Sequence, residues 1–302
     1  MTSIMEYEQE RLKLTISRHC TYQIPESTAA ESDYSSFTKD VYAHIRVRLS
    51  AFRYCSKLKS MYIFSVSITD RESEVYFNDC LQELSMSGAL LEHIITDDIL
   101  SAVPVTVKKL SIQQTVLRRE VANARIDSIC RLTDLTELHL YAIDIRELHR
   151  LLIPKDSCPS LTIPQGISAL TSLKRLTIVL CNVAALPDSF YTLTQIRHLI
   201  LSHNQLSDST ILEKMCTMSS LIYILLRSNS IEGQLPSPSR LSTLSSLKYL
   251  CLDGNNLTDE LTDQHIDSLP TTAIISVNRN SEIAVRVNSK YRDRVRADQC
   301  KR

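Results

Sequence analysis

Apolar and polar residues alternate in short stretches that recur along the chain at a nearly constant spacing. The clearest copies are LSHNQL at Leu201–Leu206, LRSNSI at Leu226–Ile231 and LDGNNL at Leu252–Leu257, and a shorter fourth copy is VNRNSE at Val277–Glu282. The alternation predicts a strand in each copy, because successive side chains of a strand point to opposite faces. Recurrence at a period of about 20–50 residues indicates stacked repeat units and not one compact core.

Aligned on the asparagine, the copies share the pattern LxxLxLxxNxL, and the copy that begins at Leu173 has Cys181 in the asparagine position. Weaker copies precede these, so that repeats begin near positions 11, 42, 58, 81, 107, 135, 173, 196, 221, 247 and 272. The pattern resembles the leucine-rich repeat, whose units of about 20–29 residues carry LxxLxLxxN/CxL. The resemblance extends over nearly the whole chain and is strongest between residues 170 and 283.

This resemblance implies a right-handed α/β solenoid, with a curved parallel sheet on the concave side and short helices and turns on the convex side. One repeat cannot cover its own leucines, so stacking the next repeat completes a continuous core. In leucine-rich repeats the asparagine turns inward and bonds main-chain groups of neighbouring turns, which would otherwise be buried and unpaired.

We expect residues 1–283 to form about ten to eleven repeats, which are degenerate before position 80. The step from 135 to 173 is too long for one repeat, so a loop is expected to be inserted near residues 148–160. Residues 284–302 are rich in arginine and lysine. We interpret them as a polar cap or tail, which an open array needs at its end; contact with an acidic partner or RNA is the alternative.

The composition gives no sign of a nucleic-acid or membrane partner. The 302 residues carry 34 basic and 34 acidic side chains, a formal net charge of +0, so no global field attracts a polyanion. No apolar run is long enough to span a bilayer. The first residues are polar and lack the features of a secretory signal, which favours a cytoplasmic location.

The sequence contains no recognisable catalytic or cofactor-binding motif. The four glycines are far apart, which argues against a phosphate-binding loop. The nine cysteines are scattered, which argues against a disulfide framework and against zinc. His198 and His203 are the only ligand-spaced histidines, but they fall at opposite ends of one predicted strand. We therefore expect no enzyme activity, no cofactor and no metal site.

In this family the concave sheet is the usual binding face, and its exposed residues are the variable positions of LxxLxLxx. Each position forms a row across the strands, since neighbouring strands lie about 4.8 Å apart. The third-position row is predicted to contain Lys13, His44, Ser60, Glu83, Lys109, Glu137, Arg175, His198, Tyr223 and Tyr249.

One region of this face is predicted to bind a partner because it combines apolar and aromatic side chains with a charged border. The apolar residues are Val179, Leu180, Ile200, Tyr223, Leu225, Tyr249 and Cys251, and the bordering residues are Arg175, His198, Arg227 and Asp253. In the alternative interpretation, some of these residues pack under a neighbour or under the C-terminal tail.

These patterns favour a non-enzymatic scaffold that binds a protein on its concave face. A receptor-type ectodomain is one alternative, because Glu232–Pro236 resembles the plant-type repeat and Asn256-Leu257-Thr258 is a glycosylation sequon. A regulatory or targeting subunit of a phosphatase or a ubiquitin ligase is another. The sequence does not identify the partner, since fold alone does not imply function.

Overall fold

The strands of the repeats form one long sheet along the solenoid. The computed structural model describes residues 3–8, 11–16, 46–47, 58–64, 67–68, 77, 79–87, 97–114, 124–142, 160–280 and 282–297. Its main sheet has 12 strands in the order β1 (Ser3–Glu8), β2 (Arg11–Ile16), β4 (Leu58–Phe64), β6 (Glu83–Ser87), β7 (Lys109–Gln114), β9 (Glu137–Ala142), β11 (Arg175–Val179), β12 (His198–Ile200), β13 (Tyr223–Leu225), β15 (Tyr249–Cys251), β18 (Ile274–Ser276) and β20 (Val295–Arg296).

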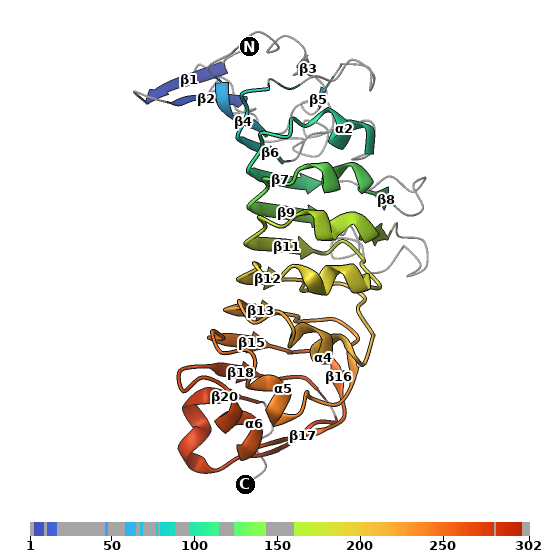
Figure 1. Ribbon diagram of the computed structural model, residues 1–302, viewed down its shortest axis with the longest axis vertical. Helices are drawn as coiled ribbons and strands as arrows, with labels where there is room; N and C mark the ends of the chain where they lie inside the picture. The colour runs from blue at the N-terminus through green and yellow to red at the C-terminus, as the bar shows by residue number, and fades with distance from the viewer. Residues whose placement is uncertain are drawn as a thin grey trace, which may run out of the picture.

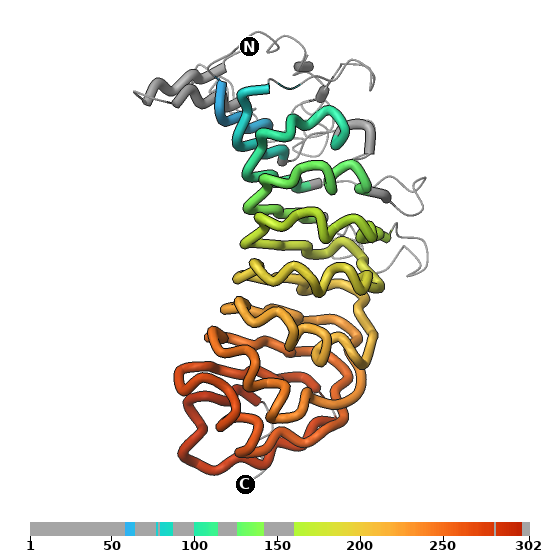
Figure 2. Tube along the Cα trace, viewed as in Figure 1, coloured from blue at the N-terminus to red at the C-terminus, as the bar shows by residue number. Residues whose placement is uncertain are grey.

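The sheet is parallel from β2 to β20, and only β1 joins it in the antiparallel direction. Figure 1 shows the strands stacked along the long axis, with β1 and β20 at opposite ends. The chain colour in Figure 2 changes in sequence order along that axis, turn upon turn. The predicted solenoid with a long parallel sheet is thus confirmed.

Short helices and turns return the chain from one strand to the next. In the described part of the chain the helices are α2 (Asp97–Ala102), η3 (Asp127–Arg131), η5 (Gln165–Ala169), η6 (Asp188–Thr192), α4 (Ile211–Met215), α5 (Pro238–Leu241), α6 (Asp263–Ser268) and η7 (Ser289–Arg294). Pro164, Pro187 and Pro238 stand at or beside the starts of three of them, where a missing N–H leaves no hydrogen bond unmade. In Figure 1, α2 and α4 lie on the side of the coil away from the edge where β6 to β15 of the main sheet are labelled.

The core is a column of leucines and isoleucines between the sheet and the helices. Leu199, Leu201, Leu226 and Leu252 have no exposed surface, and the column continues from Leu58 to Val295. Each turn covers the apolar side chains of the previous one, which is why a single repeat could not fold alone.

The repeat expected to begin near position 42 adds no strand to the main sheet. Leu14 of β2 pairs directly with Met61 of β4, and β3 (Arg46–Val47) pairs with β5 (Ser67–Ile68) in a separate sheet. The same short parallel pairing joins β14 (Glu232–Gly233) to β16 (Asn256–Leu257) on the return side of the coil. Because Lys13 pairs directly with Ser60, no residue stands between them in the third-position row, and the place predicted there for His44 is wrong.

Two further expectations fall at the edges of the described chain. The loop expected near 148–160 lies outside the described residues, except for residue 160. Part of the expected C-terminal cap is described, and there β20 pairs with β18. Arg294 of this segment donates to the carbonyl oxygens of Pro270 at 2.7 Å and Ala273 at 3.1 Å.

Buried asparagines connect consecutive turns. Asn229 donates from its Nδ2 to the carbonyl oxygens of Leu201 and Leu226, both at 3.0 Å, and accepts from the N–H of Leu206 at 3.2 Å. Asn204, Asn255 and Asn280 make the corresponding bonds in their own turns. The inward asparagine predicted from the motif is confirmed.

Cys181 takes the asparagine place with fewer bonds. Its Sγ lies 3.7 Å from the carbonyl oxygen of Leu140 in the preceding turn and 3.3 Å from that of Val179. A thiol is a weak donor and cannot replace both halves of an amide. The N–H of Cys181 is instead satisfied by Oδ1 of Asn204 in the following turn, at 3.1 Å.

The residue before each inward side chain turns the backbone sharply. His203, Ser228 and Arg279 have φ of 58°, 53° and 57°, and Leu180 before Cys181 has φ of 60°. Gly254 fills the same place with φ of 66° and without the strain that a Cβ brings there. The left-handed turn ends the strand and directs the following amide into the core.

Asn229→Ala should lower the free energy of unfolding by about 3 kcal/mol, because buried main-chain groups on two turns lose their partner. Urea-induced unfolding followed by circular dichroism measures the change. Asn256→Ala is the matched control, since its side chain is exposed and a change within about 0.5 kcal/mol is expected. Equal effects of the two substitutions would contradict a structural role for the inward amide.

Helix α6 begins with a capping box that contains a titratable group. Nδ1 of His265 lies 3.2 Å from the donating N–H of Thr262 and 2.8 Å from its hydroxyl. Burial lowers the pKa of His265, although the carboxylates of Asp259 and Glu260 oppose this. The neutral ring is therefore favoured in the folded chain, and its stabilisation is present above pH about 6.5, the ordinary histidine pKa.

The cap should weaken as pH falls below about 6.5 toward the lower pKa of the folded chain. His265→Gln keeps a capping-box acceptor without a proton to gain. Between about pH 7.5 and pH 5.5, wild type should lose up to about 1 kcal/mol more stability than the glutamine variant, the usual contribution of a cap. Urea unfolding at both pH values measures this, and identical losses would refute it.

Candidate functional site

The strand register places the third-position residues of the motif side by side on the concave sheet. Consecutive members of this row pair directly across neighbouring strands. In order along the sheet they are Lys13, Ser60, Glu83, Lys109, Glu137, Arg175, His198, Tyr223 and Tyr249. The fifth-position residues form a second continuous row, from Tyr62 through His139, Thr177, Ile200 and Leu225 to Cys251. Except for His44, the predicted third-position row is confirmed.

The N-terminal part of the third-position row pairs its own charges. Lys109 Nζ lies 3.3 Å from Glu83, and Arg175 Nη1 lies 3.9 Å from Glu137. The hydroxyl of Tyr62 donates to Glu83 at 2.9 Å. Burial of Glu83 opposes its ionisation, but the bond from Tyr62 and the charge of Lys109 together lower its pKa. Burial and the same hydrogen bond raise the pKa of Tyr62 to about 12.

The C-terminal part of the row is aromatic. His198 meets the ring of Tyr223 edge-on, with ring centroids 5.0 Å apart, and Tyr223 pairs with Tyr249 on the next strand. The guanidinium of Arg296 lies 5.6 Å from the centre of the Tyr249 ring, a cation–π distance. The row thus changes from paired charges to aromatic rings, and Arg296 of β20 lies over the last of these rings.

The residues predicted to bind a partner lie on one face but differ in exposure. Arg175, Tyr223 and Arg227 are exposed, whereas Val179, Leu180, His198, Ile200, Leu225, Tyr249 and Asp253 are half-buried. Tyr223 has 37% of its surface exposed and is among the most exposed large apolar side chains in the described part of the chain. The exposed surface is therefore narrower than the predicted patch.

Cys251 and Asp253 were expected at the surface of the patch, but Cys251 is buried and Asp253 is hydrogen-bonded within the protein. Cys251 is only 6% exposed, because the sheet continues over it through β18, where Ser276 is its partner. Burial raises the pKa of its thiol. Asp253 accepts hydrogen bonds from Ser276 Oγ at 2.6 Å and from the N–H of Asn278 at 2.9 Å. The prediction that Cys251 is exposed was wrong.

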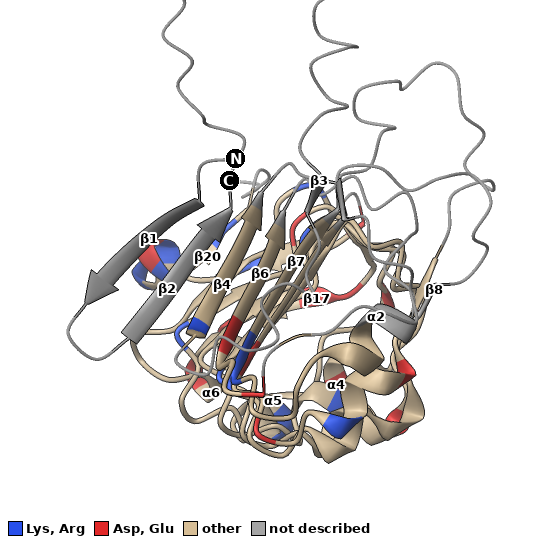
Figure 3. Cartoon of the chain, turned by 90° about the horizontal axis from the view of Figure 1, so that it is seen from above, with Lys and Arg blue, Asp and Glu red and all other residues tan. Residues whose placement is uncertain are grey.

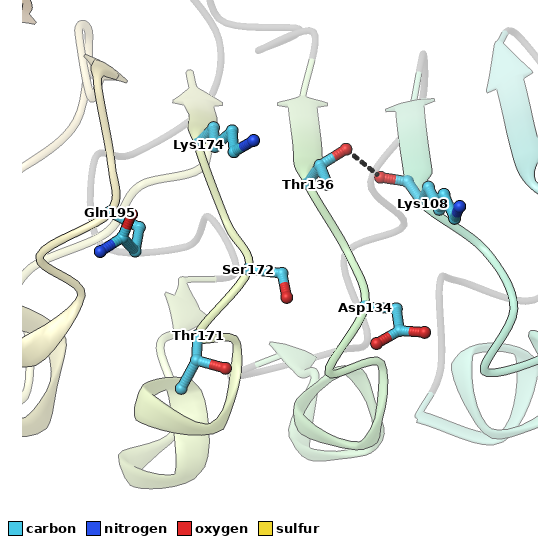
Figure 4. A pocket seen from close by; sticks show the side chains of 7 residues that line it. All are labelled: Lys108, Asp134, Thr136, Thr171, Ser172, Lys174 and Gln195. Atoms are coloured by element: carbon cyan, nitrogen blue, oxygen red, sulfur yellow. Dashed lines mark hydrogen bonds between the residues drawn. The ribbon is translucent and has the colours of Figure 1, made fainter.

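The second position of the motif also carries exposed side chains, which were not predicted from the sequence. Residues there lie where the strands begin, and several line an open hollow of ≈ 430 Å³. Figure 4 shows this hollow with Lys108, Asp134, Thr136, Thr171, Ser172, Lys174 and Gln195 around it. The same alignment that defined the third position would have identified this row, had the second position been treated as exposed.

Within the described ranges, no group of three or more His, Cys, Asp or Glu side chains is arranged to hold a metal ion. None of the helices in that part of the chain is both long and apolar enough to cross a bilayer.

No model of a known protein family matches the sequence, and a comparison with curated proteins finds no significant match. Solved structures do match. The Arabidopsis receptor kinase HAESA, in complex with the peptide hormone IDA and the co-receptor SERK1, is 20% identical with a TM-score of 0.54, and the match covers 80% of this chain and 39% of the receptor chain.

A chain in an octameric complex of Latrophilin 3, Unc5D and FLRT2, whose FLRT2 part is a leucine-rich repeat domain, is 15% identical with a TM-score of 0.50. This match covers 78% of each chain. Internalin C2 from Listeria monocytogenes is 21% identical over 65% of this chain and 71% of its own, with a TM-score of 0.45. The two matches with TM-scores of 0.54 and 0.50 establish the leucine-rich repeat fold and confirm the resemblance noted in the sequence.

Charges on the concave face should control the titration of His198. Burial lowers its pKa, Arg175 and Arg197 lower it further, and Glu137 raises it. Arg175→Gln should therefore raise the pKa of His198 and Glu137→Gln should lower it, since each removes one of these charges. NMR titration of the histidine rings, with the His198 signal assigned by His198→Gln, measures both shifts. Shifts of the same sign in the two variants would contradict this electrostatic arrangement.

Proposed function

Because the chain has the leucine-rich repeat fold, we propose that it is a non-enzymatic scaffold that binds a protein partner on the concave face of its sheet. The observation that carries the proposal is the exposure of aromatic side chains there. Among the described residues, the large apolar side chains with the most exposed surface are Val105, Tyr141 and Tyr223, and both tyrosines lie on the concave strands. Exposed tyrosines beside arginines are typical of binding hot spots.

The geometry of the face suits a protein ligand. Tyr223 is held edge-on by His198, and Tyr141 stacks on His139 with the ring planes 11° apart. His139 is in turn hydrogen-bonded to Thr177 at 3.0 Å. Rings fixed in this way lose little freedom on binding, which reduces the entropic penalty of association. A standard interface of about 1,600 Å² needs only part of such a sheet.

Similar structures offer precedents for this use of the fold. The HAESA structure is a complex with a peptide hormone and a co-receptor, and FLRT2 is part of a complex with two other proteins. These partners belong to those proteins. For this chain they support protein binding as a class of function and do not identify the ligand.

A receptor-type ectodomain is a second candidate, supported by the placement of the sequon. Asn256 and Thr258 are exposed, whereas Leu257 between them is buried. Asn256 lies in β16, outside the concave sheet, so a glycan there would leave the binding face open. Treatment of protein from its native source with a peptide N-glycosidase distinguishes the scaffold from the ectodomain. A shift in electrophoretic mobility that is absent in Asn256→Gln favours the ectodomain.

Affinity enrichment from the native cell lysate tests the scaffold. Wild type should capture a protein that Tyr223→Ala/Tyr249→Ala loses, because removing two hot-spot rings costs at least about 1.4 kcal/mol, a tenfold change in affinity. Mass spectrometry of the captured proteins identifies the partner and shows whether it belongs to a phosphatase or a ubiquitin ligase.

Val105→Ala is the control, since Val105 is 54% exposed and lies in the turn between α2 and β7, away from the sheet. It should capture the same proteins as wild type. Recovery of the same proteins with the tyrosine variant would rule out the concave aromatic surface as the binding site.

A further inference from the structure

A continuous row of residues runs along the edge where the concave strands begin. Its members occupy the second position of the motif: Lys59, Gln82, Lys108, Thr136, Lys174, Arg197, Ile222 and Lys248. The backbone N–H of each residue bonds the carbonyl oxygen of the one before, as in Lys174 to Thr136 at 2.9 Å and Arg197 to Lys174 at 2.8 Å. We call these eight residues the basic row. Their order in space is therefore fixed by main-chain bonds.

Every ionisable residue of the basic row is positively charged. Lys108, Lys174, Arg197 and Lys248 are exposed and Lys59 is half-buried. In the described part of the chain none of these five forms an ion pair, whereas the neighbouring third-position row pairs Lys109 with Glu83 and Arg175 with Glu137. Seen along the solenoid in Figure 3, basic segments lie beside acidic ones at the ends where strands such as β6 and β7 begin.

The charge of Arg197 in the basic row affects the pKa of the neighbouring His198. Apart from burial, the charges of Arg175 and Arg197 lower the pKa of His198, and Glu137 offsets them only in part. At His198 the neighbouring charges therefore act together as a positive charge, although the net charge of the chain is +0.

Beneath the row lies the hollow of ≈ 430 Å³. Lys108 and Lys174 stand on either side of Thr136, and in Figure 4 the Lys174 side chain extends toward Thr136. Ser172 and Gln195 add neutral donors, and Asp134 is the one carboxylate of the lining. An anionic group above Thr136 would be about 4.8 Å, one strand spacing, from the strand of either lysine.

We infer that the basic row binds an acidic, extended segment of the protein partner, which crosses the strands and places carboxylates against Lys108, Lys174, Arg197 and Lys248. This rests on the proposed function and specifies the chemistry of the partner. From Lys108 to Lys248 the row crosses five strand steps, or about 24 Å, the length of about seven extended residues. Ile222 lies between Arg197 and Lys248 and offers an apolar contact within the segment.

A protein segment fits the row better than a nucleic acid does. Glu83 and Glu137 lie one position further along the strands, where the bases or phosphates of a nucleic acid would meet them. A carboxylate-bearing side chain can reach single cations and leave these acids uncovered. The neutral overall charge also gives no long-range attraction for a polyanion.

Fluorescence anisotropy at low ionic strength tests the inference with defined probes. The probes are a labelled peptide of alternating Glu and Ser, the same peptide with Gln in place of Glu, and oligo(dT) of matched charge. Wild type should bind the Glu peptide, with an affinity that falls as salt is added, and should not bind the Gln peptide. Lys174→Gln/Arg197→Gln/Lys248→Gln should weaken binding about tenfold, since each exposed pair contributes modestly and three act together.

The control removes the same number of charges elsewhere. Arg286→Gln/Lys290→Gln/Arg292→Gln affects exposed residues at the C-terminal end and should change the affinity less than about twofold, as expected of charges that touch no ligand. Asp134→Asn should strengthen binding, because it removes a like charge from the hollow. Opposite effects of the row variant and Asp134→Asn would support a local site.

Three results would overturn the inference: no binding of the Glu peptide by wild type, equal weakening by the two triple variants, or tighter binding of oligo(dT) that depends on the same three cations. Capture of the partner from lysate by the tyrosine variant and by the row variant distinguishes failure of this inference from failure of the proposed function. A partner lost by the tyrosine variant but retained by the row variant would refute the basic row alone, and a partner lost by both supports the two together.

Discussion

The amide of the motif asparagine is buried where each concave strand ends, and it bonds main-chain groups of its own turn and of the turn before. In Asn255, Nδ2 donates to the carbonyl oxygens of Leu226 and Leu252, at 3.0 and 2.9 Å, while Oδ1 accepts from Ile231 at 3.0 Å. Without these bonds the end of the strand would bury main-chain groups with no partner. A side chain three atoms long can satisfy two turns only if they are stacked in one fixed register.

That register gives every motif position its own line of neighbours across the sheet. The apolar positions form the buried column, and each variable position forms a surface row with its own set of side chains. The third-position row compensates its charges between strands, as Glu83 does with Lys109, and then becomes aromatic at Tyr223 and Tyr249. Among the residues that the structure describes, the lysines and the arginine of the neighbouring basic row have no such partners. Exposed side chains of one motif position therefore form a stripe across the sheet, because the same backbone unit is repeated in every turn.

The parts of the fold that follow from local alternation and from the inward amide could be predicted from the sequence. The strands from β4 to β18 begin where the motif places them, and the order of the third-position residues from Ser60 to Tyr249 is that of the sheet. Alternation alone was insufficient around Arg46–Val47, which pair with β5 and not with the main sheet, because a return segment can alternate in the same way as a concave strand. Only pairing over a distance separates the two, and Leu14 pairs with Met61 instead.

The candidate site was harder to predict, because exposure depends on what covers a residue and not only on its position. Cys251 occupies a surface row, yet two further strands, β18 and β20, follow it and leave it 6% exposed. Tyr249 is reached by Arg296, which is 47 residues later in the chain, and no local pattern connects them. The second position was overlooked because it precedes the strand, although its lysines are exposed.

The contrast between the two neighbouring rows determines where attraction for a ligand can arise. Ions that are already paired, such as Arg175 and Glu137, give little net attraction, since a new partner must displace an existing one. The cations of the basic row form no ion pair with the residues that the structure describes, and they repel one another over spacings of about 5–10 Å, close to the screening length of physiological salt. This repulsion opposes folding slightly and is relieved when an anion binds. Occupation of the row by an acidic segment would then stabilise the folded array itself, so binding and stability are linked through the same residues.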